Sequence, residues 1–396
     1  MHHAAIRGLR SVAAVAVVAA LAVAACGGDR GPAAPAIRFL HTFGPEETEL
    51  FNAAMAERGI AVDPSLVPFA RGQQVIGEIL RAGVDCPDLI RIDATWLASF
   101  AGAGLLAPVP ASLAGLDWTP EAAALAAPTG DDRATYAIPQ AVDGLVVIRD
   151  ESRPPPGAHP AATIEELAEA ARATRTQTTR YPLGLRADGY WFVPWLRASG
   201  GELALPAGGE VAADARALAK FAALYGDVVP PPPPAGGEAP HELRRWLAHD
   251  IAYWVTGPWQ IGALAERERL AVSALAHAPR GGQLLVVPTC ARRPDEGWRL
   301  AAELVDRAVA GTFADAFTTV PSRRSTLEAS GPLVRAIYAA LVAAEPLPRV
   351  AATPFLFDDL NPAIASVIAG DATADEAMAG VRRGWLRLAS TLGGKK

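Results

Sequence analysis

The sequence predicts an α/β protein with two lobes, and two observations support this fold class. Apolar runs typical of strands, at 37–43, 60–69 and 88–92, alternate with helical patterns at 45–59 and 72–83. The chain has 396 residues, of which 51% are hydrophobic, and this is enough for two lobes that each bury a core. The alternation favours mixed, mainly parallel sheets flanked by helices.

The first elements have recognisable ends. Pro45 and the acidic residues after it mark the start of a helix, and Gly59 marks its end. The run 88–92 ends at Asp93, and another helical stretch follows at 95–103. An acid directly after a buried strand calls for an explanation, because an unpaired buried carboxylate is unfavourable.

The later part of the chain continues the alternation. The stretch 134–150 is β-rich, and Thr163 and Glu166 form a capping box that starts a helix at 163–175. The apolar run at 284–289 predicts a late strand.

Two other segments can be assigned from their sequence patterns. The helical pattern at 295–311 predicts one helix that ends at Gly311. The proline-rich stretch 228–240 predicts a stiff, exposed connection, either a surface loop within one lobe or a linker.

The N-terminus predicts export. Basic residues precede a short apolar run at 12–25, in the order typical of a secretory signal. The sequence "VAAC", which ends at Cys26, resembles a bacterial lipobox, and this resemblance implies a signal peptide at 1–26 and lipidation of Cys26. An ordinary signal with an incidental cysteine is the alternative. Residues 27–36 then form a flexible tether.

Composition argues against several functions. The net charge is −6, and no basic patch marks a nucleic-acid partner. Neither a G-x-S-x-G nucleophile elbow nor an H-E-x-x-H zinc motif occurs. We therefore expect no cofactor, no metal and no catalytic residue.

Three acids mark a candidate ligand site. Asp93 follows a strand, Asp143 lies in the apolar context "IPQAVDGLVVI", and Asp188 precedes a cluster of aromatics. In open α/β sheets, ligands bind beyond the carboxyl ends of the strands. A carboxylate accepts hydrogen bonds from neighbouring sugar hydroxyls. For Asp93 the alternative is a simple helix cap.

Aromatic residues complete that pattern, because the apolar face of a sugar ring fits an aromatic plane. Tyr190 and Trp191 follow Asp188, and Trp259 stands directly after the turn of "TGPW". Three other tryptophans are expected in the core, namely Trp195, Trp246 and Trp385.

Several blocks together resemble a known family. They are "CPDLIRIDATWLASFAGAGLLAPV", "YAIPQAVDGLVVIRD", "WVTGPWQIGAL", "RPDEGWRLAAELV" and "VPSRRS". In this order they are similar to the extracellular solute-binding proteins of ABC importers, in the group of the maltose- and trehalose-binding proteins. The resemblance implies a type II-like periplasmic-binding-protein fold whose two lobes close on a sugar about a hinge crossed more than once. It also implies a monomer outside the cytoplasm that delivers its sugar to a membrane permease.

The resemblance implies lobe boundaries and site residues as well. One lobe comprises 37–141 and 281–321, and the other comprises 142–280 and 322–396. The implied sugar contacts are Asp93, Asp143, Asp188, Tyr190, Trp191, Trp259, Phe357, His41, Phe43 and Glu46. Because the strands at 88–92 and 284–289 would be antiparallel in this fold, a disulfide between Cys86 and Cys290 is expected, with two free thiols as the alternative.

Some features leave alternatives open. Phe357 replaces the commoner tryptophan of the family, and the stretch after Trp259 is compact, so the identity and size of the sugar are not implied. Arg71 and Arg186 are candidates for a phosphate-ester site, and a polyamine or metal is a further possible ligand. A sensor lipoprotein and an extracytoplasmic glycosidase with Asp93 and Asp143 as its acids are the other readings.

Overall fold

We analysed a computed structural model, which describes residues 35–127, 134–152, 161–205, 212–231 and 241–393. The predicted signal peptide, Cys26 and positions 27–34 of the tether lie outside the described residues. The chain divides into two units, Met1–Ala36 and Ile37–Lys396, and everything below concerns the second.

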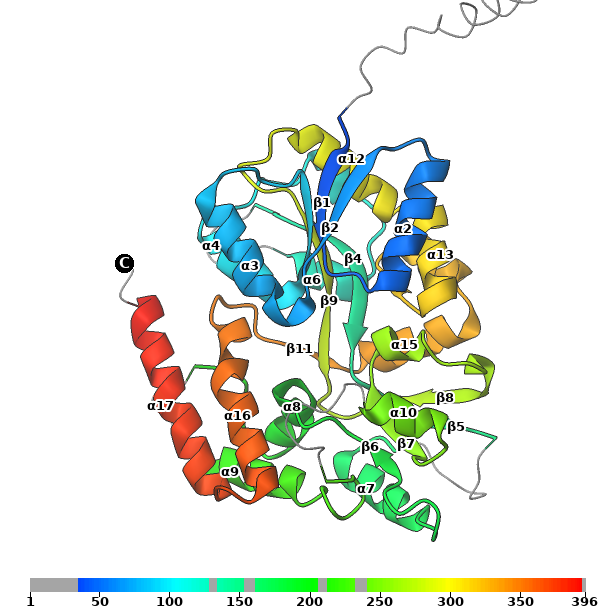
Figure 1. Cartoon of the computed structure of the whole chain (residues 1–396), viewed down its shortest axis with the longest axis vertical. Helices are drawn as coiled ribbons and strands as arrows, with labels where there is room; N and C mark the ends of the chain where they lie inside the picture. Colours follow the sequence, from blue (N-terminus) through cyan, green and yellow to red (C-terminus); the bar gives the residue numbers. More distant parts are fainter. Residues whose placement is uncertain (1–34, 128–133, 153–160, 206–211, 232–240, 394–396) are drawn as a thin grey trace, which may run out of the picture. The chain divides into compact units, whose positions relative to one another are not determined.

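The larger sheet holds the first three strands. Its order is β10-β4-β9-β3-β1-β2, with β11 paired to β9. The strands are β1 (Ile37–His41), β2 (Val62–Leu66), β3 (Leu89–Asp93), β4 (Ile138–Gly144), β9 (Pro279–Val286), β10 (Val320–Pro321) and β11 (Glu345–Pro346). Figure 1 shows β9 as a long strand that runs from this sheet toward the other half of the ribbon.

Helices cover both faces of this sheet. The first group packs on the face of Ile90 and Ile92, and the second packs on the face of Leu89 and Leu285. The first group comprises α3 (Phe69–Ala82), η1 (Ala94–Trp96), α4 (Leu97–Gly102) and α6 (Pro120–Ala126). The second comprises α2 (Pro45–Glu57), α12 (Pro294–Leu304) and α13 (Arg307–Phe317). The short α5 (Ala111–Ala114) precedes α6.

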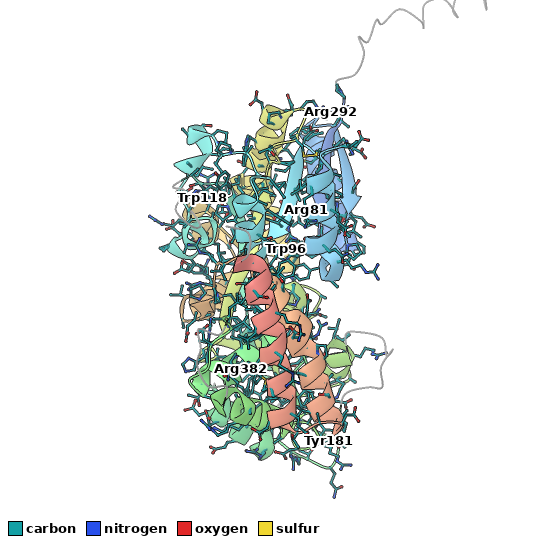
Figure 2. The ribbon with its side chains drawn as sticks, turned by 90° about the vertical axis from the view of Figure 1, so that its left-hand side faces the viewer. Arg81, Trp96, Trp118, Tyr181, Arg292 and Arg382 are labelled. Carbon is teal, nitrogen blue, oxygen red and sulfur yellow. A yellow bond between two sulfur atoms is a disulfide. The ribbon has the colours of Figure 1, made fainter. Side chains whose placement is uncertain are left out.

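The smaller sheet has the order β6-β7-β5-β8. Its strands are β5 (Val146–Asp150), β6 (Leu183–Gly184), β7 (Tyr253–Thr256) and β8 (Leu270–Ser273). The helices of this half are α7 (Ile164–Ala173), α8 (Gly189–Ala198), α9 (Ala212–Ala222), α10 (His241–Leu247), α11 (Pro258–Ile261), η2 (Arg267–Arg269), η3 (Thr353–Phe355), α16 (Leu356–Ala369) and α17 (Ala374–Gly393). Figures 1 and 2 both show α16 and α17 side by side, and they pack against α9.

The strand pairing is mixed, but less parallel than the sequence predicts. β1 is parallel to β2 and β3, whereas β9 is antiparallel to both β3 and β4. In the smaller sheet β5 is antiparallel to β7 and to β8. The antiparallel share is large because β4 and β9 carry the chain out of the larger sheet and back into it.

The crossing between the sheets is tight. β4 ends at Gly144, and β5 starts two residues later. Gly144 has a φ of +154°, and a Cβ there would lie 2.6 Å from the carbonyl oxygen of Pro279 on β9. Glycine is therefore required where the two crossing segments touch.

The helices α14 (Arg324–Ala329) and α15 (Pro332–Val342) lie close to both sheets. Their buried residues share one core with Ile92 of the larger sheet and Ile148 of the smaller one. The lobe boundaries at 141/142, 280/281 and 321/322 stay a prediction.

One predicted helix is wrong. The stretch 295–311 is not a single helix, because α12 ends at Leu304 and α13 begins at Arg307. The side chain of Asp306 caps α13 by accepting a hydrogen bond from the Ala308 amide at 3.0 Å. Gly311 lies inside α13 rather than at a helix end. A strong aspartate cap therefore decides the break.

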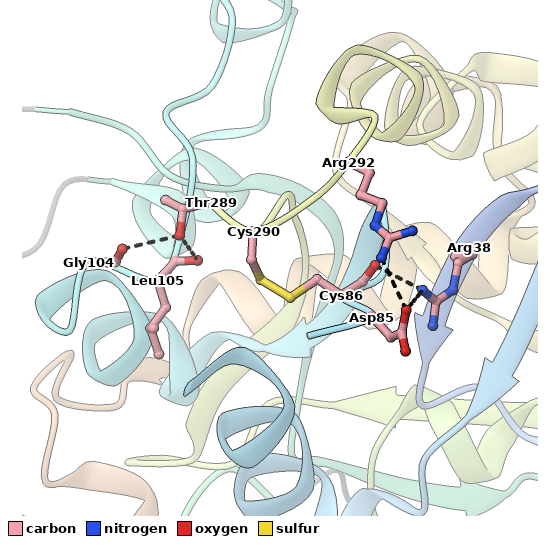
Figure 3. The surroundings of a disulfide bond; sticks show 8 residues. All are labelled: Arg38, Asp85, Cys86, Gly104, Leu105, Thr289, Cys290 and Arg292. Carbon is pink, nitrogen blue, oxygen red and sulfur yellow. Dashed lines mark hydrogen bonds and ion pairs between the residues drawn. A yellow bond between two sulfur atoms is a disulfide. The ribbon is translucent and has the colours of Figure 1, made fainter. Parts of the chain in front are cut away.

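A disulfide joins Cys86 and Cys290, the pairing that the sequence analysis expects, with the Cα atoms 5.8 Å apart. The reason lies in the register of β3 and β9, in which Ile90 is opposite Val286. Cys86 lies four residues before Ile90 and Cys290 four residues after Val286, so the same register places the two cysteines opposite each other. Figure 3 shows Arg292 and Arg38 on either side of Asp85 beside this bridge.

Candidate ligand-binding site

The acidic residues of the site lie on one face of the larger sheet. Asp93 at the end of β3 is opposite Gln283 of β9, and Asp143 of β4 is opposite Gly281. An irregularity between Pro139 and Ala141 shifts the register of β4 by one residue. Because side chains alternate along a strand, this shift places Asp143 on the same face as Gln283 and Asp93.

Gln283 connects the two carboxylates. Its Nε2 donates to Oδ2 of Asp143 at 3.1 Å, and its side chain also hydrogen-bonds to Asp93. Burial, and then the negative charge of Asp93, raise the pKa of Asp143 to about 7. Burial also raises the pKa of Asp93. Two neighbouring acids with one shared amide thus form an acceptor-rich site.

Asp93 has a second role that agrees with the alternative reading from the sequence. Its Oδ1 accepts from the amide of Thr95 at 2.8 Å and from the Thr95 hydroxyl at 2.5 Å. Asp93 is thereby the N-cap of η1. Capping occupies one oxygen, and the other side of the carboxylate remains next to Gln283.

Arg91 is the buried cation behind these acids, with a relative exposure of 8%. Its Nε donates to Oε1 of Gln140 and its Nη1 to the hydroxyl of Thr42, both at 2.7 Å. The guanidinium also lies 4.6 Å above the ring of Phe43. These contacts hold Arg91 in place, so its hydrogen bonds serve the scaffold.

A cavity of about 280 Å³ lies in front of this face. The larger sheet, the start of α2, the loop before β10 and the α11 turn all contribute to its wall. The lining residues include Glu46, Glu47, Arg91, Asp143, Gln283, Trp259, Phe317 and Thr319. Residues from both halves of the chain therefore enclose one space, as a ligand site between lobes requires.

The aromatic part of the wall centres on Trp259, whose relative exposure is 43%. The rings of Trp191 and Tyr190 contact it edge-on, with centroids 6.1 Å and 6.4 Å away. The Tyr190 hydroxyl donates to the carbonyl of Pro279 at 3.3 Å. A Cβ at Gly281 would lie 3.0 Å from Oδ1 of Asp143 and 3.6 Å from this hydroxyl, so Tyr190 reaches the acids.

Three predicted residues support the site from outside the cavity lining. Asp188 caps α8 by accepting from the Tyr190 amide at 2.9 Å. Trp191 is 8% exposed and donates its indole N–H to the carbonyl of Val255 at 2.9 Å. Phe357 is half-buried and packs against Gly189, where a Cβ would approach its ring to 2.7 Å. These residues hold the start of α8 and the rings near Trp259.

His41 and Phe43 do not face the cavity. Their relative exposures are 1% and 2%, and their rings pack with Phe39 and Phe51 in the core. Burial, and then the charge of Arg91, lower the pKa of His41 to about 4. The expected contact through these side chains is therefore corrected, because His41 lies on the same helix-covered face of β1 as Phe39 and Phe43 packs beside them. Of the predicted loop, Glu46 does line the cavity.

Sequence reasoning missed Gln283 and Arg91. Both are polar residues within apolar strand sequences, Gln283 in "GGQLLV" and Arg91 in "DLIRID". A polar residue inside a strand of that kind has to be paired or ligand-facing, which is the same signal that pointed to Asp93.

The arginines of the phosphate alternative lie elsewhere. Arg186 is 5.2 Å from the ring of Trp191, and Arg71 is exposed on α3. Neither lines the cavity. In the part of the chain that the structure describes, no group of three His, Cys, Asp or Glu residues has an arrangement that would hold a metal ion.

A sequence model of bacterial extracellular solute-binding proteins matches residues 60–335 of this chain. The chain belongs to this family. The protein is thus a solute-binding protein that acts outside the cytoplasm and not an enzyme. A search of curated proteins finds no match.

Solved structures agree with this membership. The GacH receptor of Streptomyces glaucescens, crystallised unliganded and with acarbose, is 25% identical over 89% of this chain and 98% of its own, with a TM-score of 0.75. A maltose-bound MalE3 of T. maritima is 18% identical over 89% of this chain and 100% of its own, also at 0.75. A maltotriose-bound MalE domain of Bdellovibrio bacteriovorus is 15% identical over 89% and 99%, at 0.74. The two-lobe solute-binding fold is confirmed.

Within the described residues, no helix combines the length and the apolar character needed to cross a membrane.

Proposed function

We propose that this protein captures a sugar between its lobes and delivers it to the permease of an ABC importer. The solved relatives include proteins bound to maltose, maltotriose and acarbose, and the GacH receptor is similar over nearly its whole length. Capture proceeds by hinge closure, in which the ligand favours the closed form because both lobes contact it only there. The protein acts as a monomer.

One observation carries this proposal. The exposed plane of Trp259 and the acceptors of Asp143 and Gln283 line one cavity. A sugar presents an apolar C–H face to an aromatic ring and hydroxyl donors at its edges. The cavity offers both complements.

We also propose that Cys26 carries the lipid anchor and that residues 27–36 tether the protein to the membrane. The support is the lipobox-like sequence that ends at Cys26. Mass spectrometry of the mature N-terminus tests this, because lipidation adds a diacylglyceryl mass to Cys26. An unmodified Cys26 would contradict the lipid anchor and favour an ordinary signal peptide.

A thermal-shift and calorimetry screen against mono- and disaccharides tests sugar capture. A ligand at about 100 times its dissociation constant should stabilise the folded protein by about 2.7 kcal/mol. The Trp259→Ala variant should bind at least about tenfold more weakly, because the stacking plane is lost.

Phe69 provides a matched control, since it is another exposed aromatic, at 54%, and packs on Trp96 away from the cavity lining. Phe69→Ala should leave sugar affinity unchanged. Equal losses in both variants would contradict the assignment of Trp259, and a response to phosphate esters alone would replace the sugar by another ligand.

A further inference from the structure

The charges around the cavity do not balance. Three carboxylates line it, on Glu46, Glu47 and Asp143, and Asp93 lies beside them through Gln283. Arg91 is the cation among the described lining residues. Its Nε and Nη1 donate to Gln140 and Thr42, and its single positive charge offsets one of the acids.

One buried acceptor of the cavity wall has no hydrogen-bond partner among the described residues. Gln283 is 8% exposed and lines the cavity, and its Oε1 has no partner within the described residues. The amide orientation follows from the structure, because Nε2 donates to Asp143. At the start of α2, Pro45 brings no N–H, and the Gly44 N–H is taken by Glu47 at 2.7 Å. Neither Gly44 nor Pro45 therefore offers a free backbone donor to the cavity.

An unpaired buried acceptor and an uncompensated buried charge are both unfavourable, and a ligand that supplies a hydrogen-bond donor and a positive charge would relieve both. A neutral sugar would satisfy acceptors but leave the charge. A protonated amine supplies three donors and a compensating charge. The face of Trp259 suits such a cation as well as a sugar ring.

We infer that the ligand is a sugar that carries a protonated amino group, with the ammonium placed between Asp143 and Gln283 and the ring against Trp259. This inference rests on the proposed sugar capture and names the class of sugar.

The test compares matched pairs by calorimetry at pH 7: glucosamine with glucose, galactosamine with galactose, and mannosamine with mannose. For at least one pair, the amino sugar should bind about tenfold or more tightly than its neutral partner, as expected for a hydrogen bond to a charged group. The N-acetylated sugar, which has no charge, should bind like the neutral partner.

Asp143→Asn retains the shape of the side chain and removes its charge, and it should abolish the preference for the amino sugar. Glu46→Gln at the exposed rim should reduce the preference without risk to folding. Glu57→Gln is the control, because Glu57 is exposed at the far end of the same helix, about 17 Å along the axis from Glu46. It should leave the preference unchanged.

The outcomes separate the two proposals. Equal or tighter binding of the neutral sugars would overturn the amino-sugar inference and leave sugar capture intact. Binding of putrescine or spermidine without binding of any sugar would overturn both the amino-sugar inference and sugar capture. The absence of binding in every sugar pair would overturn both as well. A preference that survives Asp143→Asn and Glu46→Gln would place the ammonium elsewhere and contradict the inference.

Discussion

Asp143 shows how one carboxyl is adjusted by its surroundings. It lies on a crossing strand, receives one hydrogen bond from Gln283 and faces the charge of Asp93. Burial and that charge favour its protonated form, and the positive charge of Arg91 opposes them. Because burial removes this carboxyl group from water, a donor on a ligand would give it a new hydrogen bond and favour its charged form.

The raised pKa of Asp143 predicts how stability depends on pH. In the unfolded chain the carboxyl loses its proton near 3.8, whereas in the folded protein it keeps the proton up to about 7. Between these values the folded state binds more protons, so the free energy of unfolding falls as the pH rises. The loss attributable to Asp143 between pH 4 and pH 8 should be on the order of 2 kcal/mol.

Urea denaturation at several pH values checks this, with Asp143→Asn as the comparison. The variant should lose less stability than the wild type across that window. Parallel curves for the two proteins would show that Asp143 keeps an ordinary pKa.

At the scale of elements, close approach between helix and sheet depends on single glycines. Gly297 in α12 packs against the backbone directly before β3. A Cβ at Gly297 would lie 2.0 Å from the carbonyl oxygen of Asp88. That oxygen belongs to backbone, so the helix would have to move. Gly311 in α13 has no atom within 4 Å of the same position.

The two glycines therefore predict opposite effects of alanine. Gly297→Ala should lower the free energy of unfolding by about 1–3 kcal/mol, because overpacking outweighs the gain in helix propensity. Gly311→Ala should raise it by about 0.5–1 kcal/mol, since only propensity changes. Denaturant unfolding measures both, and equal effects would contradict the packing argument.

The disulfide predicts a second effect at this scale. Cys86 and Cys290 are 204 residues apart in sequence, and their bridge restricts the unfolded chain. Removing it by Cys86→Ser with Cys290→Ser should destabilise the protein by about 2–5 kcal/mol. A reductant should destabilise the wild type alone, because the double variant has no bridge to reduce. If a reductant does not change the free energy of unfolding of the wild type, the disulfide is absent or does not contribute to stability.

At the scale of the whole chain from Ile37 onward, the cavity lies where β4 and β9 carry the chain between the two sheets. Gly144 permits β4 to touch β9 at Pro279, and Asp143 stands directly before this contact. This candidate binding residue thus lies at the crossing itself. A ligand that pulls on Asp143 acts on the segment about which the halves would move.

Closure predicts a change that scattering can detect. A saturating sugar should reduce the radius of gyration in small-angle X-ray scattering, because the halves come together on the ligand. The same sugar concentration should leave Trp259→Ala unchanged. If the wild type binds sugar in calorimetry but its radius of gyration does not fall, sugar capture would stand and hinge closure would be excluded.

The sequence by itself determined the alternation of strands and helices, the capping box of Thr163 and Glu166 and the acid after β3, because these depend on local propensity and on periodicity. It also carried the resemblance that led to the family. Only the tertiary structure decided that His41 and Phe43 lie in the core and that Gln283 joins Asp93 and Asp143. The physical reason is that these outcomes depend on register and packing between residues up to 190 positions apart, such as Asp93 and Gln283, and local patterns do not contain that information.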